Sequence, residues 1–209
     1  IPEGLTAIAI IEKYIEAIGG KEKLEAAKSY AMTSAAEMQG MKLELEMKKT
    51  TKNQFMQDVK MMGNSMSKQV LNGDGGYIVA QGQRKDLSEE EVIKIKEEAA
   101  IFPELNYATL EGITLEGMEM VGDNDAYKLK VNDNKLAFYD VKTGLKLQEV
   151  NITEMQGQQM TSTFNFENYQ EVDGILFPFK LIQTVGPQNF EFIVSEIKIN
   201  DGVSAVDFE

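Results

Sequence analysis

The side chains best suited to acid–base chemistry in this sequence are its carboxylates. The 209 residues include 34 aspartates and glutamates but neither histidine nor cysteine. Without imidazole or thiolate, the chain cannot form a Ser-His-Asp triad, a Cys-His pair, a His-rich zinc site or an iron facial triad. Most hydrolase mechanisms and most transition-metal sites are therefore excluded.

A pair of carboxylates can hydrolyse a glycosidic bond without histidine or cysteine. Such enzymes also need aromatic platforms for the sugar, and this sequence has no tryptophan. Among 34 acidic residues, some carboxylate pairs arise by chance. A carboxylate enzyme is therefore only the third hypothesis for this chain, and we assign no catalytic residue.

Four aspartates lie in turns rich in glycine and asparagine, where carboxylates could hold calcium. They are Asp74, Asp123, Asp125 and Asp133. None has the spacing of a calcium-binding loop with its distant glutamate, and tight turns use aspartate for local backbone hydrogen bonds. We interpret all four as turn residues, and we predict neither a metal site nor a cofactor.

Composition and charge define the class of protein. Hydrophobic residues make up 43% of the chain and charged residues 26%, which is typical of a globular protein. A net charge of -13, with Arg84 as the only arginine, disfavours nucleic acid as a partner. No apolar run approaches the roughly 18 to 20 residues that span a bilayer, so no membrane span is predicted. The start at Ile1-Pro2 suggests that an upstream segment has been removed.

Helical signals occur near the start and near the middle of the chain. Thr6 is a suitable N-cap and Gly19-Gly20 a suitable end for a first helix, with Ile8, Ile11, Ile15 and Ile18 at helical spacing. A shorter helix is predicted over residues 21–27. Ser88 and Glu91 form a capping box, which predicts a third helix that buries Val92, Ile95 and Ala99 before Pro103.

Strand signals fill most of the remaining chain. Residues 41–48 alternate strictly between apolar and charged side chains, which predicts a strand with one wet face. Further strands are predicted at 66–71, 77–79, 114–120, 126–131, 136–141, 145–155, 159–169, 175–185 and 190–200. The connections are short, so neighbouring strands must be antiparallel. We therefore predict a mainly β (α+β) fold: a curved meander of about eleven strands, covered by two or three helices.

The apolar positions of these strands are the candidate ligand-binding residues. They are Leu43, Leu45, Met47, Phe55, Val59, Tyr127, Leu129, Phe138, Phe164, Phe177 and Phe179, together with Met41. One interpretation is that they line a concave face that holds an acyl chain. The other is that helices fill the concavity and the same residues form an ordinary core. A titration with a fluorescent fatty acid distinguishes the two.

Methionine is the second apolar feature of the sequence. There are twelve methionines, including Met61, Met62, Met66, Met118, Met120 and Met160. Their flexible thioether side chains can repack around varied apolar ligands. This favours an adaptable binding surface, although a drift in composition explains the count nearly as well.

Several segments resemble envelope proteins of the Bacteroidetes type. They are residues 14–24, 99–107, 125–131, 139–146 and 169–178, of which Tyr-Asp-x-Lys-Thr-Gly-Leu and Val-Asp-Gly-Ile-x-Phe-Pro are the most specific. Such segments occur in LolA-like proteins, which resemble outer membrane lipoprotein-sorting proteins. They also occur in the domain that follows insulinase-type zinc peptidase modules. This chain lacks the histidines of the peptidase motif, so the resemblance implies no peptidase activity.

The resemblance implies one LolA-like domain over residues 1–209: a half-barrel of about eleven antiparallel strands around an apolar cavity, located in the periplasm. Our first hypothesis is a non-catalytic carrier-like domain that binds a lipid or an acylated lipoprotein. The alternative is an accessory C-terminal domain of an insulinase-family zinc peptidase-like protein, with the peptidase domain in the same chain as its partner.

Overall fold

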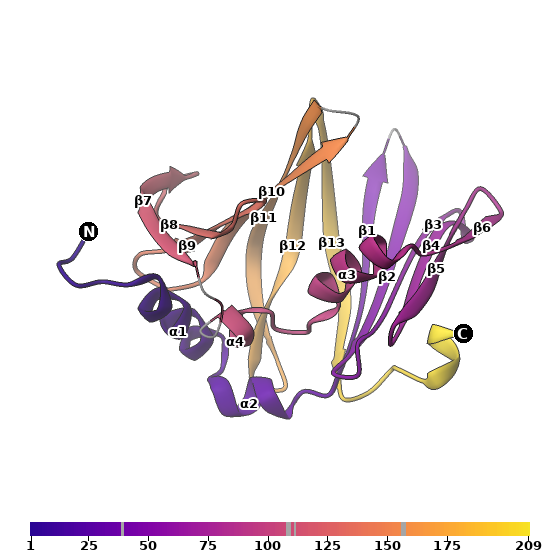
Figure 1. The fold of residues 1–209 in the computed structure, drawn as a ribbon, viewed down its shortest axis with the longest axis horizontal. Helices are drawn as coiled ribbons and strands as arrows, with labels where there is room; N and C mark the ends of the chain where they lie inside the picture. Colours follow the sequence, from indigo (N-terminus) through magenta and orange to yellow (C-terminus); the bar gives the residue numbers. More distant parts are fainter. Residues whose placement is uncertain (39, 108–109, 111, 156–157) are drawn as a thin grey trace. The chain divides into compact units, whose positions relative to one another are not determined.

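The structure is a computed structural model that describes residues 1–38, 40–107, 110, 112–155 and 158–209 (Figure 1). The chain forms two compact units. We call Ile1–Leu24 with Glu104–Glu191 the α1 unit, and Glu25–Pro103 with Phe192–Glu209 the α3 unit. The expectation of a single domain over residues 1–209 stays a prediction.

Strands dominate both units. In the α3 unit the strand order is β6-β5-β4-β3-β2-β1-β13, and in the α1 unit it is β12-β11-β10-β9-β8-β7. Their bounds are β1 (Ser29–Met38), β2 (Met41–Thr50), β3 (Gln54–Met61), β4 (Asn64–Asn72), β5 (Gly75–Ala80), β6 (Gln83–Asp86), β7 (Thr114–Val121), β8 (Asn124–Asn132), β9 (Lys135–Asp140), β10 (Lys146–Met155), β11 (Gln158–Val172), β12 (Ile175–Val185) and β13 (Gln188–Ile199). The antiparallel meander is confirmed, with thirteen strands in the described part of the chain instead of about eleven.

The first helix, α1 (Ala7–Ile18), begins and ends where its caps predict. The Thr6 hydroxyl accepts a hydrogen bond from the Ala9 amide at 3.2 Å, and Gly19 ends the helix with a φ of 142°. Ile11, Ile15 and Ile18 are buried as expected, whereas Ile8 is exposed and Ile10 is buried in its place. The buried stripe runs through positions 7, 11, 14 and 18, which leaves position 8 on its flank. The next helix is α2 (Lys21–Ala26).

The third predicted helix is α3 (Glu89–Ala99), and its capping box is present. The Ser88 amide donates to the Glu91 carboxylate at 2.8 Å, and the Glu91 amide donates back to the Ser88 hydroxyl at 3.3 Å. The helix contacts β3, β4 and β5, and it buries Val92, Ile95 and Ala99 against the sheet. A four-residue helix that was not predicted, α4 (Glu104–Tyr107), follows Pro103.

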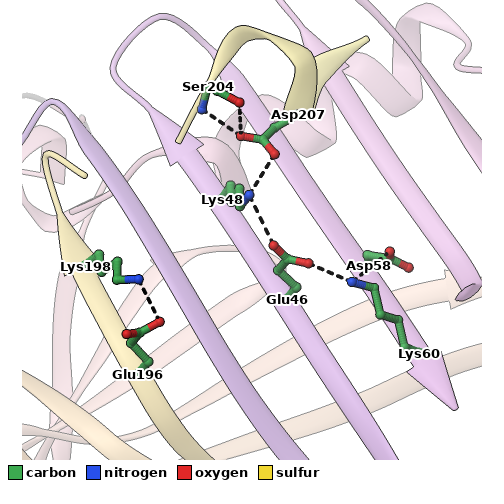
Figure 2. A network of polar contacts seen from close by, with 8 residues as sticks. All are labelled: Glu46, Lys48, Asp58, Lys60, Glu196, Lys198, Ser204 and Asp207. Carbon is green, nitrogen blue, oxygen red and sulfur yellow. Dashed lines mark hydrogen bonds and ion pairs between the residues drawn. The ribbon is translucent and has the colours of Figure 1, made fainter. Parts of the chain in front are cut away.

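The two faces of β2 and β3 differ in chemistry, as the alternation in residues 41–48 predicts. On the face opposite α3, which we call the charged face, Glu46 pairs with Lys60 at 2.8 Å and with Lys48 at 3.2 Å (Figure 2). Lys48 also pairs with Asp207 at 2.7 Å, in the short helix η1 (Ala205–Phe208). Figure 2 shows this chain of alternating charges from β3 to η1. The C-terminal segment is therefore fixed on the charged face.

Candidate functional site

The candidate residues of the α3 unit lie on one face of the sheet, the face that α3 covers. Leu45 pairs with Val59 across β2 and β3, and Lys49 pairs with Phe55. Because directly paired residues share a face and alternate residues repeat it, Leu43, Leu45, Met47, Phe55 and Val59 all point the same way. We call this set the apolar face. The structure thus places these five candidates on one face, and Met41, two residues before Leu43 on β2, shares it.

Burial divides the apolar face into two parts. Phe55 is fully buried beneath α3, in a cluster with Leu71 and Ile95, and Met47 packs against that cluster. Phe55 is therefore an ordinary core residue, as in the second interpretation of the sequence. Leu43, Leu45 and Val59 continue the same face further along the strands, and each is only half-buried.

Ser34 places a buried hydroxyl on the apolar face. Ser34 of β1 pairs with Leu45 on one side and with Val194 on the other. Its hydroxyl is fully buried and has no hydrogen-bond partner among the described residues. A buried hydroxyl left unpaired costs about 1 to 3 kcal/mol, so the Ser34 hydroxyl is a local cost to stability.

In the α1 unit, five of the six candidates share a face. Leu129 pairs with Ala137, Ala137 with Glu149, and Glu149 with Phe164, so the four form one row across the sheet. The other candidates on this face are Tyr127, Phe177 and Phe179. The structure places Tyr127, Leu129 and Phe177 in buried positions and leaves Phe164 and Phe179 half-buried.

Phe138 is the candidate that lies on the opposite face. It pairs with Lys128 of β8, and the ammonium group of that lysine is 6.0 Å from the centre of the Phe138 ring. Its neighbours Ala137 and Tyr139 lie on the shared face, opposite Leu129 and Tyr127. Phe138 therefore cannot join Tyr127 and Leu129 in lining one surface.

The shared face of the α1 unit also holds a buried polar cluster that the sequence did not reveal. The Lys146 ammonium is 2.7 Å from the Glu104 carboxylate of α4 and 3.5 Å from that of Glu149. The Tyr14 and Phe166 rings flank it, with centres at 5.9 Å and 4.9 Å. These contacts tie α1, α4 and β10 together.

Protonation states in this cluster argue against catalysis by it. Burial alone lowers the pKa of Lys146, but the Glu104 and Glu149 carboxylates outweigh burial and raise that pKa well above its ordinary value. The amine is therefore charged and cannot act as a base or nucleophile. The Tyr139 hydroxyl is buried without a partner among the described residues, and burial raises its pKa as well. The cluster has the properties of a structural ion pair.

Two of the four turn aspartates pair with lysines, and Asp125 lies in β8 instead of in a turn. Asp74, between β4 and β5, is 2.5 Å from the Lys96 ammonium, and Asp133, between β8 and β9, is 2.7 Å from that of Lys130. In the part of the chain that the structure describes, no group of three or more acidic side chains could hold a metal ion. The positions of Asp74 and Asp133 agree with their interpretation as turn residues.

The comparisons with known proteins identify the fold. No family model matches the sequence, and no curated protein matches it. A LolA superfamily protein from Nitrosomonas europaea is similar in structure, with a TM-score of 0.62 and 13% identity over 99% of this chain and 98% of that chain. A DUF1329 family protein from Desulfovibrio piger has a TM-score of 0.57 and 13% identity over 96% of each chain.

These similarities confirm the resemblance to LolA-like proteins and the fold class expected from the sequence. The chain has a LolA-like fold, an antiparallel half-barrel with helices. At 13% identity the similarity describes the fold alone. Among the described residues, no helix has the length and the apolar character that crossing a membrane requires.

Proposed function

We propose that the chain is a carrier-like domain that binds the acyl part of a lipid or of an acylated lipoprotein on the apolar face of the α3 unit. The observation that carries the proposal is the half-buried part of that face. Leu43, Leu45 and Val59 extend the apolar surface beyond the cluster beneath α3, on strands whose opposite face is charged.

The energetics favour such a ligand. Each methylene removed from water contributes about 0.8 kcal/mol, so an acyl chain laid along half-buried leucine and valine side chains gains several kcal/mol. The flexible Met47 side chain, at the margin of the core cluster, can adjust to the bound chain. No directional contact is needed, which suits a carrier of varied lipids.

Binding without catalysis is part of the proposal. The sequence has no histidine or cysteine, and the one buried lysine cluster described above stays charged. The LolA-like fold and the resemblance to lipoprotein-sorting proteins support a location in the periplasm, as part of the same proposal. The accessory role beside a zinc peptidase stays a prediction from the resemblance.

A titration with a fluorescent fatty acid such as 11-dansylaminoundecanoic acid tests the proposal. We expect saturable binding, and we expect Leu45→Gln to weaken it roughly tenfold because the variant exposes a polar amide to the acyl chain. The matched control is Ile193→Gln, since Ile193 is an exposed apolar residue on the charged face. Absence of saturable binding, or an equal loss in both variants, would overturn the proposal.

A further inference from the structure

The turn between β3 and β4 contains an unusual residue. Met61 pairs with Asn64, so Met62 and Gly63 form a two-residue hairpin turn. Their φ angles are 52° and 80°, both in the left-handed region. This turn geometry strongly favours asparagine followed by glycine, because asparagine tolerates a positive φ better than other side chains do.

Methionine at this position destabilises the turn, and its exposed side chain adds little packing that could offset this loss. The other non-glycine residues with positive φ among the described residues are Asn53, Gln81, Asn168, Asp173 and Asn200, all of them polar. Met62 is apolar, and it is 82% exposed. A residue that strains the backbone and buries little surface points to a role outside folding.

Two further methionines lie close to this turn. Leu43 pairs with Met61, so the start of β2 lies beside the β3–β4 turn. Met41 at that start is 37% exposed, and Met66, the extra residue of a bulge in β4, is 41% exposed. We call Met41, Met62 and Met66 the methionine tip.

The methionine tip is continuous with the apolar face. Met41, Leu43 and Leu45 alternate along β2 and therefore point the same way. An apolar stripe thus runs from an exposed end at Met41 to the half-buried residues that the proposed function uses. A ligand that reached the tip could pass onto the apolar face without crossing a charged surface.

The charges near the tip indicate what kind of surface it fits. Lys42, next to Met41, pairs with Glu44 at 2.8 Å, so the neighbourhood carries balanced charge. The whole chain has a net charge of -13 and is repelled by anionic membranes. Exposed thioether side chains beside neutralised charges suit the interface of a zwitterionic bilayer.

We propose that the methionine tip docks on a zwitterionic lipid bilayer, from which the apolar face takes up acyl chains. The inference rests on the proposed function and adds the source of the ligand. Met62 inserts between headgroups, and its strained turn holds the side chain outward. The second copy of the chain, as an alternative occupant, is disfavoured because two chains of this charge repel each other.

Vesicles of pure phosphatidylcholine test the docking, with Met62→Asn compared to Gln81→Asn. Gln81 and Gly82 form a two-residue turn between β5 and β6 with the same signs of φ. Both variants relieve a strained turn, so both should raise the melting temperature by about 2 °C. Only Met62→Asn should weaken vesicle partitioning, by roughly tenfold.

Three outcomes would overturn the docking. They are no partitioning of the unmodified protein, equal partitioning of both variants, and a concentration-dependent dimer in sedimentation velocity that Met62→Asn abolishes. Titration with the dansyl fatty acid in vesicle-free solution distinguishes a failure of membrane docking from a failure of the proposed ligand binding. Saturable solution binding without vesicle partitioning removes only the docking, whereas loss of solution binding removes the proposed function.

Discussion

At the residue scale, Asp140 shows what the Tyr-Asp-x-Lys-Thr-Gly-Leu segment does in the structure. Its carboxylate accepts hydrogen bonds from the amides of Lys142 and Thr143 and from the Thr143 hydroxyl. Gly144 completes the turn with a φ of 77° and donates to the Asp140 carbonyl at 2.9 Å. The Tyr-Asp-x-Lys-Thr-Gly-Leu segment is therefore a turn held by a buried aspartate, and its residue types follow from that geometry.

We expect Asp140 to make stability depend on pH. Burial raises the pKa of its carboxyl, but the hydrogen bonds from Thr143 and Lys142 outweigh burial and lower that pKa below the ordinary 3.8. Since the folded state prefers the carboxylate, its stabilisation is complete above about pH 4 and is lost as the pH falls through the lower, folded-state pKa. Asp140→Asn should cost about 1 to 2 kcal/mol at pH 7 and less at pH 3.

Urea unfolding at pH 7 and at pH 3 measures this difference. Asp123→Asn, at an exposed aspartate in the β7–β8 turn, is the matched control, and we expect it to leave stability unchanged at both pH values. An Asp140→Asn variant whose loss of stability is the same at both pH values would contradict the role of the carboxylate charge.

At the element scale, α4 depends on a buried ion pair. The helix has only four residues, and Glu104 at its start meets Lys146 of β10 with both side chains almost fully buried. So short a helix has little stability of its own. The ion pair and the flanking Tyr14 and Phe166 rings therefore position α4 in the α1 unit.

Removing one partner of this pair should be worse than removing both. Lys146→Met leaves the Glu104 carboxylate buried and unpaired, and we expect it to destabilise the protein by about 3 to 5 kcal/mol. Adding Glu104→Leu should recover most of that loss. The exposed pair Lys42–Glu44 is the control, where Lys42→Met should cost less than about 1 kcal/mol. Denaturant titrations measure all four proteins, and a double variant no more stable than Lys146→Met would refute the idea.

Elements with strong local signals were predictable from the sequence, and elements without them were not. The caps at Thr6 and Ser88 located α1 and α3 because each cap makes its own hydrogen bonds. Residues 83–86, which form β6, are all polar and exposed, so they lack the alternation that marks a strand with one buried face. α4 is too short to show a helical period.

For the candidate site, too, only residues with a clear local pattern could be placed from the sequence. Strict alternation placed Leu43, Leu45 and Met47 on one face, because β2 has one apolar and one charged side. In β9, residues 137–140 are all buried, so alternation there does not tell which side Phe138 takes. The Lys146 cluster could not be predicted, since Glu104 lies 42 residues earlier in the chain and meets it only through the fold.

At the scale of the whole molecule, the proposed role of the chain is to hold lipid. In the α3 unit, β2 and the facing part of β3 separate apolar Leu43, Leu45 and Val59 on one face from charged Glu46 and Lys60 on the other. In the α3 unit, the apolar face has a covered part beneath α3 and a half-buried part beyond it. The central claim is that an acyl chain occupies the half-buried part.

Photo-crosslinking with a diazirine analogue of palmitic acid tests this claim most directly. After irradiation, digestion and mass spectrometry, we predict that the label lies on peptides from residues 41–61, which include Leu43, Leu45 and Val59, and that excess palmitate prevents it. Labelling on the charged face around Ile193, or labelling spread over the chain in proportion to exposed surface, would contradict the account.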